Sequence, residues 1–454
     1  MQLLRRYRRE GAILGVILLT AIALAFFSAT RNNPAAPSQT LGEIMGQGNR
    51  TAPVAPASSS LTDSQIATYQ QKSRTSPNDP QAFSNLGLAY LQKARETGDP
   101  TYYTKAEGVF NKSLELDPSN ADAMGGLGSL ELSRHQFAKA LEWGQKAHNL
   151  RPQTAYHVGV MADALVELGR YDEALETIQQ MVDLRPDVSS YARVSYIREL
   201  MGQYDGAIEA MKEAVIAGGP ATENVAWVTY QLGMLYFNKN DLTQAEASFQ
   251  QSLSLEPNYV YALSGIASVK AAQGDTATAI KIMTDVSQRF PLQQFIIQLG
   301  DLYTVSGKPA EANRQYDLVR AIQKLYQQNG VDTDLEMALF DADHDYNLPQ
   351  AVQEARQVVV QRKSVKAYDA LAWTLYKSGD YKGAEEASRQ ALRLGTLDSL
   401  YFYHAGMIAS KLGQTTEARD YLNKALSQNP NFSLLYAPQA AQTLASLGGP
   451  VAAR

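Results

Sequence analysis

The sequence of 454 residues contains no cysteine, which excludes disulfide bonds and attachment to a membrane through a lipidated cysteine. It has five histidines, so several catalytic classes lack their usual base. Phosphate-binding glycine loops, Gly-x-Ser-x-Gly elbows and His-Glu-x-x-His helices are also absent from the sequence. We therefore expect a protein that is not an enzyme and that has no cofactor and no metal site.

A strongly basic surface is missing as well. The chain carries 41 basic and 46 acidic residues, a formal net charge of −5. No run of lysines and arginines occurs after residue 61, whereas a nucleic-acid-binding surface usually needs one. Nucleic acid is therefore not an expected partner.

What the sequence does contain is a periodic alanine. Successive members are separated by 34, 34, 33, 38, 34, 33, 39, 33 and 34 residues. The ten positions are Ala106, Ala140, Ala174, Ala207, Ala245, Ala279, Ala312, Ala351, Ala384 and Ala418. A fixed period of this length indicates one supersecondary unit that repeats along the chain and stacks into a solenoid.

Three further features give the structure of the unit. A second small residue stands twelve positions before most of the alanines, for example Gly128 and Gly233, and allows two helices to cross closely. Between the two positions lies a glycine, such as Gly169 or Gly274, as expected where a helix ends in the left-handed region. A proline such as Pro257 follows the second helix and stops it. Each unit is predicted to be helix, turn, helix, stop.

These residues resemble the tetratricopeptide repeat family over about Asn78 to Asn431, or about ten repeats. The clearest copy consists of Leu232, Gly233, Tyr236, Ala245, Phe249, Ser252 and Pro257. The resemblance implies an all-α, right-handed solenoid of helical hairpins. Its concave face, lined by the first helix of each repeat, is expected to bind a protein or peptide. Residues 331–395 also resemble segments of exported bacterial members that have no defined activity.

Departures from the period predict the domain organisation. Extra residues around 94–101 are expected to lengthen the loop inside repeat one, and two later irregularities divide the array into three sub-stacks. Leu435, Leu444 and Leu447 are expected to cover repeat ten. The predicted parts are residues 61–217 (repeats 1–4), 218–326 (repeats 5–7), 327–431 (repeats 8–10) and 432–454 (a C-terminal capping helix and tail).

The N-terminal part predicts a membrane anchor. Residues 11–30 carry no charge, and twenty helical residues span about 30 Å, the thickness of a bilayer's hydrocarbon core. Residues 1–10 contain four arginines, which predicts that this tail stays in the cytoplasm. The repeats are then extracytoplasmic, in the periplasm if the source is a Gram-negative bacterium. The alternative is a signal peptide cleaved near Ala23-Leu24-Ala25, followed by secretion. Residues 31–60 are rich in Pro, Ala and Ser and are predicted to form a disordered linker.

Inner-face positions of the first helices supply the candidate partner-binding residues. Repeat five offers one apolar and aromatic group, and repeats eight to ten offer a larger aromatic and acidic group, which we take as the main site. Such side chains suit a basic or aromatic peptide. The candidates are Trp227, Tyr230, Met234, Phe237, Glu336, Phe340, Asp343, His344, Asp369, Trp373, Tyr376, Tyr403, His404 and Met407.

Two alternatives remain open for these residues. In the first alternative, Phe340 and Trp373 only fill gaps between helices, and the acidic side chains form a solvated face. In the second, the C-terminal groove binds a small ligand or a metal ion, so that the protein is a sensor or carrier. Residues 340–345 offer carboxylates and an imidazole, but residues this close on one helix cannot all face one ion.

Overall fold

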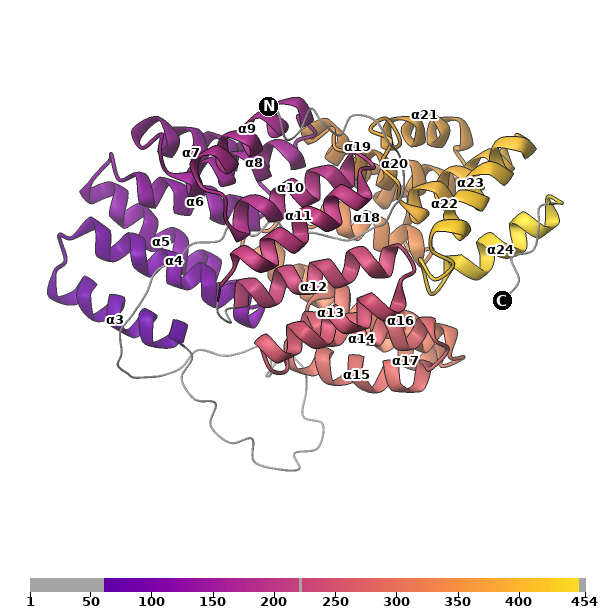
Figure 1. Cartoon of the computed structure of the whole chain (residues 1–454), viewed down its shortest axis with the longest axis horizontal. Helices are drawn as coiled ribbons and strands as arrows, with labels where there is room; N and C mark the ends of the chain where they lie inside the picture. The colour runs from indigo at the N-terminus through magenta and orange to yellow at the C-terminus, as the bar shows by residue number, and fades with distance from the viewer. Residues whose placement is uncertain (1–60, 220–222, 449–454) are drawn as a thin grey trace. The chain divides into compact units, whose positions relative to one another are not determined.

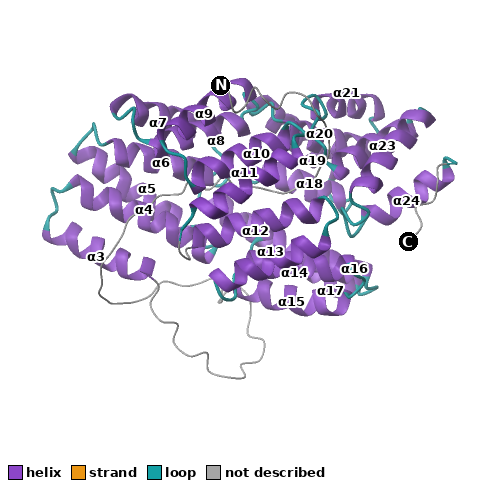
Figure 2. Ribbon diagram, viewed as in Figure 1, coloured by secondary structure: helices purple, strands orange, loops and turns teal. Residues whose placement is uncertain are grey.

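The computed structural model describes residues 61–219 and 223–448, and these ranges contain twenty-two helices. Figure 2 shows helices and loops, with no strand in this part of the chain. The predicted transmembrane helix at 11–30 and the linker at 31–60 lie outside the described residues. Among the described helices, none combines the length and the apolar character that a membrane crossing requires.

Ten helical hairpins follow one another along the chain, with one further helix before them and one after them (Figure 1). The flanking helices are α3 (Leu61–Thr75) and α24 (Tyr436–Ser446). The hairpins are α4 (Pro80–Thr97) with α5 (Thr101–Leu116), α6 (Ala121–Ser133) with α7 (Phe137–Leu150), α8 (Ala155–Glu167) with α9 (Tyr171–Leu184), α10 (Val188–Leu200) with α11 (Tyr204–Ala217), α12 (Glu223–Asn238) with α13 (Leu242–Leu255), α14 (Val260–Ala272) with α15 (Thr276–Arg289), α16 (Gln293–Val305) with α17 (Pro309–Gln328), α18 (Asp334–Asp343) with α19 (Leu348–Gln361), α20 (Val365–Ser378) with α21 (Tyr381–Ala391), and α22 (Ser399–Lys411) with α23 (Thr415–Gln428).

The periodic residues have the structural roles that the sequence predicts. All ten alanines are fully buried, with 0–1% of their surface exposed. The glycines between the helices adopt positive φ angles, for example 76° at Gly169 and 85° at Gly274. His135 takes the same place in repeat two with a φ of 59°, which the glycine pattern alone did not reveal. The all-α hairpin solenoid is therefore confirmed.

Large rings packed on glycines hold neighbouring hairpins together. Phe249 of α13 is fully buried and lies against Gly233 of α12 and Gly265 of α14. A Cβ atom at either glycine would come within 2.5 Å of the ring. Phe110 has the same relation to two glycines, Gly87 and Gly126. One aromatic side chain thus joins two helices of its own repeat and the first helix of the next.

The described residues divide into two compact units: 161–324 with 332–448, and 61–160 with 325–331. At the predicted irregularity near 327, α17 continues to Gln328 and becomes a helix of 20 residues. The extra residues of repeat one likewise extend α4 to Thr97, and Gly98 ends it with a φ of 66°. Both insertions therefore lengthen helices. The division into three sub-stacks stays a prediction.

Hydrogen bonds between loops far apart in sequence are a second source of order in the larger unit. The Lys363 amide donates to the Leu168 carbonyl at 3.2 Å, and the Thr396 hydroxyl donates to the Leu200 carbonyl. The Asn429 side chain donates to the Phe237 carbonyl at 3.2 Å. The side-chain bonds of this set join residues 191 to 196 positions apart. We call these contacts the loop clasps.

The smaller unit contains contacts of the same kind. The Arg134 Nε donates to the Asn329 carbonyl at 3.0 Å, 195 residues further along the chain. The Tyr326 hydroxyl donates to the carbonyl of Gly98 at 3.0 Å. Residues 325–331 thereby belong to the unit that α3 to α7 form.

The two flanking helices differ in how well the sequence predicts them. The expected capping helix is confirmed as α24, which packs Tyr436, Ala440 and Leu444 into the core of the last repeats. Helix α3 was not predicted. It packs through Ile66 and Tyr69 on the first hairpin.

Substitution of Gly169 tests the loop clasps. A Cβ atom there would lie 2.3 Å from the carbonyl oxygen of Lys363, in addition to the strain of a positive φ. Gly274 has a similar φ and nothing within 4 Å of the same position. We expect Gly274→Ala to cost about 1–2 kcal/mol, and Gly169→Ala to cost about 1–2 kcal/mol more, in urea unfolding. Equal losses in the two variants would contradict the clasp at Gly169.

Candidate functional site

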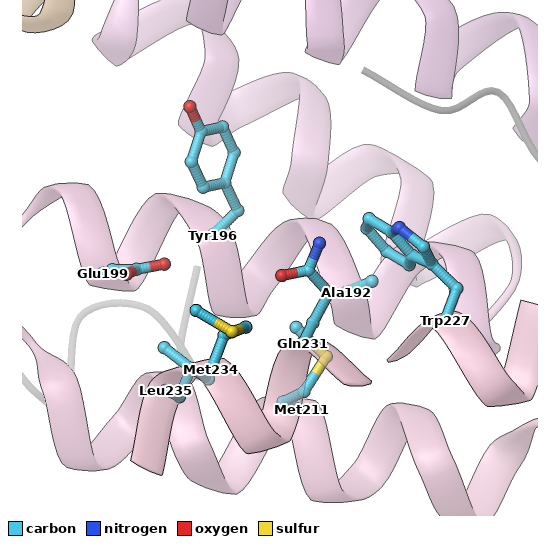
Figure 3. Close-up of a pocket in the computed structure, with 8 residues that line it drawn as sticks. All are labelled: Ala192, Tyr196, Glu199, Met211, Trp227, Gln231, Met234 and Leu235. Carbon is cyan, nitrogen blue, oxygen red and sulfur yellow. The ribbon is translucent and has the colours of Figure 1, made fainter. Parts of the chain in front are cut away.

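The first helices of repeats four and five enclose a small hollow together with α11 (Figure 3). It is lined by Ala192, Tyr196, Glu199, Met211, Trp227, Gln231, Met234 and Leu235. Its volume of about 20 Å³ is room for a water molecule, whereas sites for small organic ligands measure about 300–1,000 Å³. We call it the Trp227 hollow. Its size suits the tip of one side chain.

Helical spacing explains why these side chains meet. Trp227, Gln231 and Met234 are spaced i, i+4 and i+7 on α12, so they lie on one face. Ala192, Tyr196 and Glu199 repeat the same spacing on α10. The sequence analysis selected Trp227 and Met234, and both line the hollow as half-buried side chains. It missed Gln231 and Glu199, although the same spacing would have found them.

Two polar groups in the hollow have no partner within the part of the chain that the structure describes. Gln231 is 5% exposed, and its side-chain amide makes no hydrogen bond. The carboxyl group of Glu199 makes neither a hydrogen bond nor an ion pair with the described residues, and Figure 3 shows it at the opposite end of the hollow from Trp227, with the Gln231 amide between them. Buried polar groups in proteins are nearly always paired. These two groups are therefore available to a binding partner.

Burial, and secondarily the charge of Asp398, raise the pKa of Glu199 to about 8. Asp398 precedes α22 and caps it, since its carboxylate accepts from the Leu400 and Tyr401 amides at 2.7 and 3.2 Å. Tyr196 directs its hydroxyl to Glu167 at 3.5 Å rather than to Glu199. Among the described residues that line the hollow, none is a lysine or an arginine.

The other two candidates of repeat five are core residues. Tyr230 and Phe237 are buried in a cluster with Phe249, Tyr259 and Ala262. The Tyr230 ring lies 5.8 Å from that of Phe249. The expectation that these two side chains are exposed is wrong, because the next repeat packs directly over their positions.

Burial also differs from expectation in repeats eight to ten. Phe340, Asp369, Trp373, Tyr403, His404 and Met407 are buried, and Glu336, Asp343, His344 and Tyr376 are partly buried. Trp373 is 1% exposed and stacks on His404, with ring centres 4.2 Å apart and planes 13° apart. Tyr436 of α24 packs edge-on against Trp373 at 5.3 Å. The capping helix therefore covers positions that were expected to line an open groove.

Several polar atoms of this set are paired, with one another or with Tyr436, whereas the buried His404 Nε2 has no hydrogen-bond partner among the described residues. Asp343 accepts hydrogen bonds from Trp373 Nε1 at 2.8 Å and from the Tyr436 hydroxyl at 3.0 Å. Asp369 pairs with His404 Nδ1 at 3.0 Å. Burial raises the pKa of Asp343, and the neighbouring histidines and Trp373 oppose that rise.

Two further candidates, His344 and Glu336, also have charged neighbours. His344 Nε2 lies 2.9 Å from Asp301, and Glu336 lies 3.8 Å from Lys366. Within residues 61–219 and 223–448, no group of three or more His, Asp or Glu side chains is arranged to hold a metal ion. A binding role for this C-terminal set stays a prediction.

The unpaired state of Glu199 has a testable consequence for stability. The folded protein keeps a proton up to about pH 8 that the unfolded chain loses near pH 4.5, so the free energy of unfolding falls between these two values. Glu199→Gln removes this loss. We expect its stability relative to wild type to increase from pH 4.5 to 8 in urea unfolding. The control is Glu209→Gln, at an exposed position of α11. Parallel pH profiles for wild type and Glu199→Gln would exclude the raised pKa.

Comparison with known proteins adds relatives in sequence. Cellulose synthase 1 operon protein C of Komagataeibacter xylinus is 24% identical over 299 residues, which is 63% of this chain and 19% of that protein. Human tetratricopeptide repeat protein 21A is 24% identical over 64% of this chain and 24% of its own length. The chain thus spans about a fifth to a quarter of the length of these relatives.

Solved structures show more distant similarity. Human IFIT1, in a structure of its dimer with m7Gppp-AAAA, is 16% identical over 73% of this chain and 76% of that chain, with a TM-score of 0.47. A thermophilic TPR protein of Thermus thermophilus is 19% identical over 40% of this chain and 98% of its own, with a TM-score of 0.36.

Family models described as tetratricopeptide repeat match residues 94–153, 160–222, 229–259 and 370–431. These matches fall on hairpins that the structure shows, from α4 to α23. They agree with the period, the buried alanines and the glycine turns. The chain belongs to the tetratricopeptide repeat family.

Proposed function

We propose that this protein is a membrane-anchored scaffold outside the cytoplasm and that it binds a protein or peptide partner at the Trp227 hollow. The tetratricopeptide fold implies protein or peptide partners in general. The observation that carries the proposal is Gln231, a residue that is 5% exposed and lines the hollow, with no hydrogen bond from its side chain to the described residues. Trp227 and Met234 beside it are half-buried apolar side chains of the kinds that anchor interfaces.

The hollow is a better candidate than the C-terminal set. In the C-terminal set, Asp343 and Asp369 already have hydrogen-bond donors, and α24 covers Trp373. A partner would have to break these contacts before it could bind. At the Trp227 hollow it would instead supply contacts that are lacking.

Site-specific photo-crosslinking tests the binding site. A photoreactive amino acid replaces Met234 in the full chain, and Val360 of α19, which is 82% exposed, is the control position. We expect one discrete adduct from position 234 in the native membrane fraction and none from position 360. Adducts of the same mass from both positions would remove the hollow as the binding site.

The location outside the cytoplasm is supported by the sequence of residues 1–30 alone. Fusions of alkaline phosphatase or a cytosolic fluorescent reporter to the C-terminus test it in a Gram-negative host. We expect phosphatase activity without fluorescence, and retention in the membrane fraction unless residues 11–30 are deleted. Fluorescence in the cytosol would contradict the proposed topology, and a processed chain free in the periplasm would support signal cleavage.

A further inference from the structure

We propose that the Trp227 hollow receives a lysine or arginine side chain of the partner, with its cationic head between Glu199 and Gln231. This inference rests on the proposed function, because it names the chemistry of the partner at that same site. It follows from three features of the hollow: its unpaired polar atoms, its charges and its apolar walls.

The polar atoms match a cationic donor. Glu199 offers two carboxylate oxygens, and Gln231, a residue that is 5% exposed overall, offers one amide oxygen. Neither oxygen set has a donor within the described residues. Lysine and arginine head groups carry three and five N–H donors and no acceptor. One such head group therefore carries enough donors for both side chains.

The surrounding charges favour a cation. Asp398 acts on Glu199 as a second carboxyl group, and its own hydrogen bonds come from backbone amides only. The basic side chains on adjoining elements are engaged elsewhere. Arg193 of α10 pairs with Asp163 at 2.6 Å, and Arg198 donates to the Gly206 carbonyl at 2.8 Å.

Arg362, which follows α19, lies 3.8 Å from Glu167 and is therefore also held by an acid. With a neutral or acidic guest, burial and the charge of Asp398 would keep Glu199 protonated at neutral pH. A basic guest supplies the missing positive charge, in a setting where water screens it poorly.

The apolar walls match the stem of such a side chain. Met211 and Leu235 form a buried wall, and Met234 and Trp227 stand half-buried beside them (Figure 3). Lysine and arginine carry three or four methylene groups that pack on apolar surface while the head reaches a polar site. The indole of Trp227 adds attraction for a cation, since tryptophan gives the strongest cation–π contacts.

A pH dependence follows. Because the pKa of Glu199 is raised to about 8, the free protein keeps this carboxyl protonated at neutral pH, and a bound cation displaces the proton. Lysine and arginine stay charged throughout this range. The affinity should therefore rise by up to about tenfold per pH unit between pH 6 and 8 and then level off.

Selection from a random dodecapeptide phage library tests the inference on the purified full chain. We expect the enriched peptides to share a lysine or arginine at one fixed position. Replacing that residue by glutamine in the peptide, or Glu199→Gln in the protein, should weaken binding by about 10- to 100-fold. Glu209→Gln on the exposed side of α11 should leave binding unchanged.

The outcomes separate this inference from the proposed function. Enriched peptides that compete with Met234 crosslinking but share no basic residue would overturn the inference and leave the binding site standing. The same holds if basic peptides bind Glu199→Gln as tightly as wild type. A library that yields no specific peptide at all would count against peptide binding itself.

Discussion

Replacing Phe249 by alanine is expected to lower the free energy of unfolding by about 3–5 kcal/mol. The ring is fully buried between two glycines of neighbouring helices, and neither glycine has a side chain that can collapse into the space. The loss combines the transfer of the ring to water with a cavity that α12 and α14 cannot close. The effect should appear as a large drop in the midpoint of urea unfolding, which is measured by circular dichroism.

Val360→Ala is the matched control, because it also removes apolar atoms but from a side chain that is 82% exposed. It should change stability by less than about 0.5 kcal/mol. If Phe249→Ala cost no more than this control, the proposal that one ring joins two repeats would fail. Comparison of midpoints suits a repeat protein, since unfolding of long arrays departs from two-state behaviour.

Replacing Asp343 by alanine is expected to cost about 1–3 kcal/mol and to loosen the capping helix. The carboxylate accepts from Trp373 of α20 and Tyr436 of α24, so its removal leaves the Trp373 Nε1 donor unsatisfied, while the Tyr436 hydroxyl keeps only the Asp343 backbone carbonyl at 3.0 Å. Each stranded donor costs about 1–3 kcal/mol. Amide hydrogen exchange should accelerate across α24 first, because Tyr436 is its main anchor there.

Asp343→Asn separates this explanation from a general packing defect. The same oxygen, Oδ1, accepts both hydrogen bonds, and asparagine retains one such acceptor. We expect Asp343→Asn to recover most of the protection of α24. If asparagine and alanine exposed α24 equally, hydrogen bonding to Asp343 would not be what holds the helix.

The local features of the fold can be predicted from the sequence because they depend on residues within one repeat. The alanine period fixes the hairpins, and the left-handed glycines mark the turns. Helix α24 is predictable from its leucines, which face the preceding repeat. Helix α3 could not be predicted in this way, because the apolar side chains that it packs on the described core, Ile66 and Tyr69, are too few to form a period.

The candidate site was only partly predictable, because burial of an inner-face position depends on what crosses over it. Tyr230 and Trp373 occupy inner-face positions that the sequence predicts to bind a partner, but the next repeat covers one and α24 covers the other. Glu199 was missed for a related reason. Asp398, whose charge acts on Glu199, lies almost two hundred residues away in sequence, and no local sequence pattern predicts this interaction.

The loop clasps have a consequence for how this protein can change over generations. Repeat arrays usually grow or shrink by duplication or loss of whole repeats, because each repeat contacts only its neighbours. Here Leu200 is hydrogen-bonded to Thr396 and Phe237 to Asn429, across 196 and 192 residues. An additional repeat of 34 residues, inserted between the two partners of each loop clasp, would shift the partners relative to each other and break all of these hydrogen bonds. The copy number of this array is therefore constrained by its geometry.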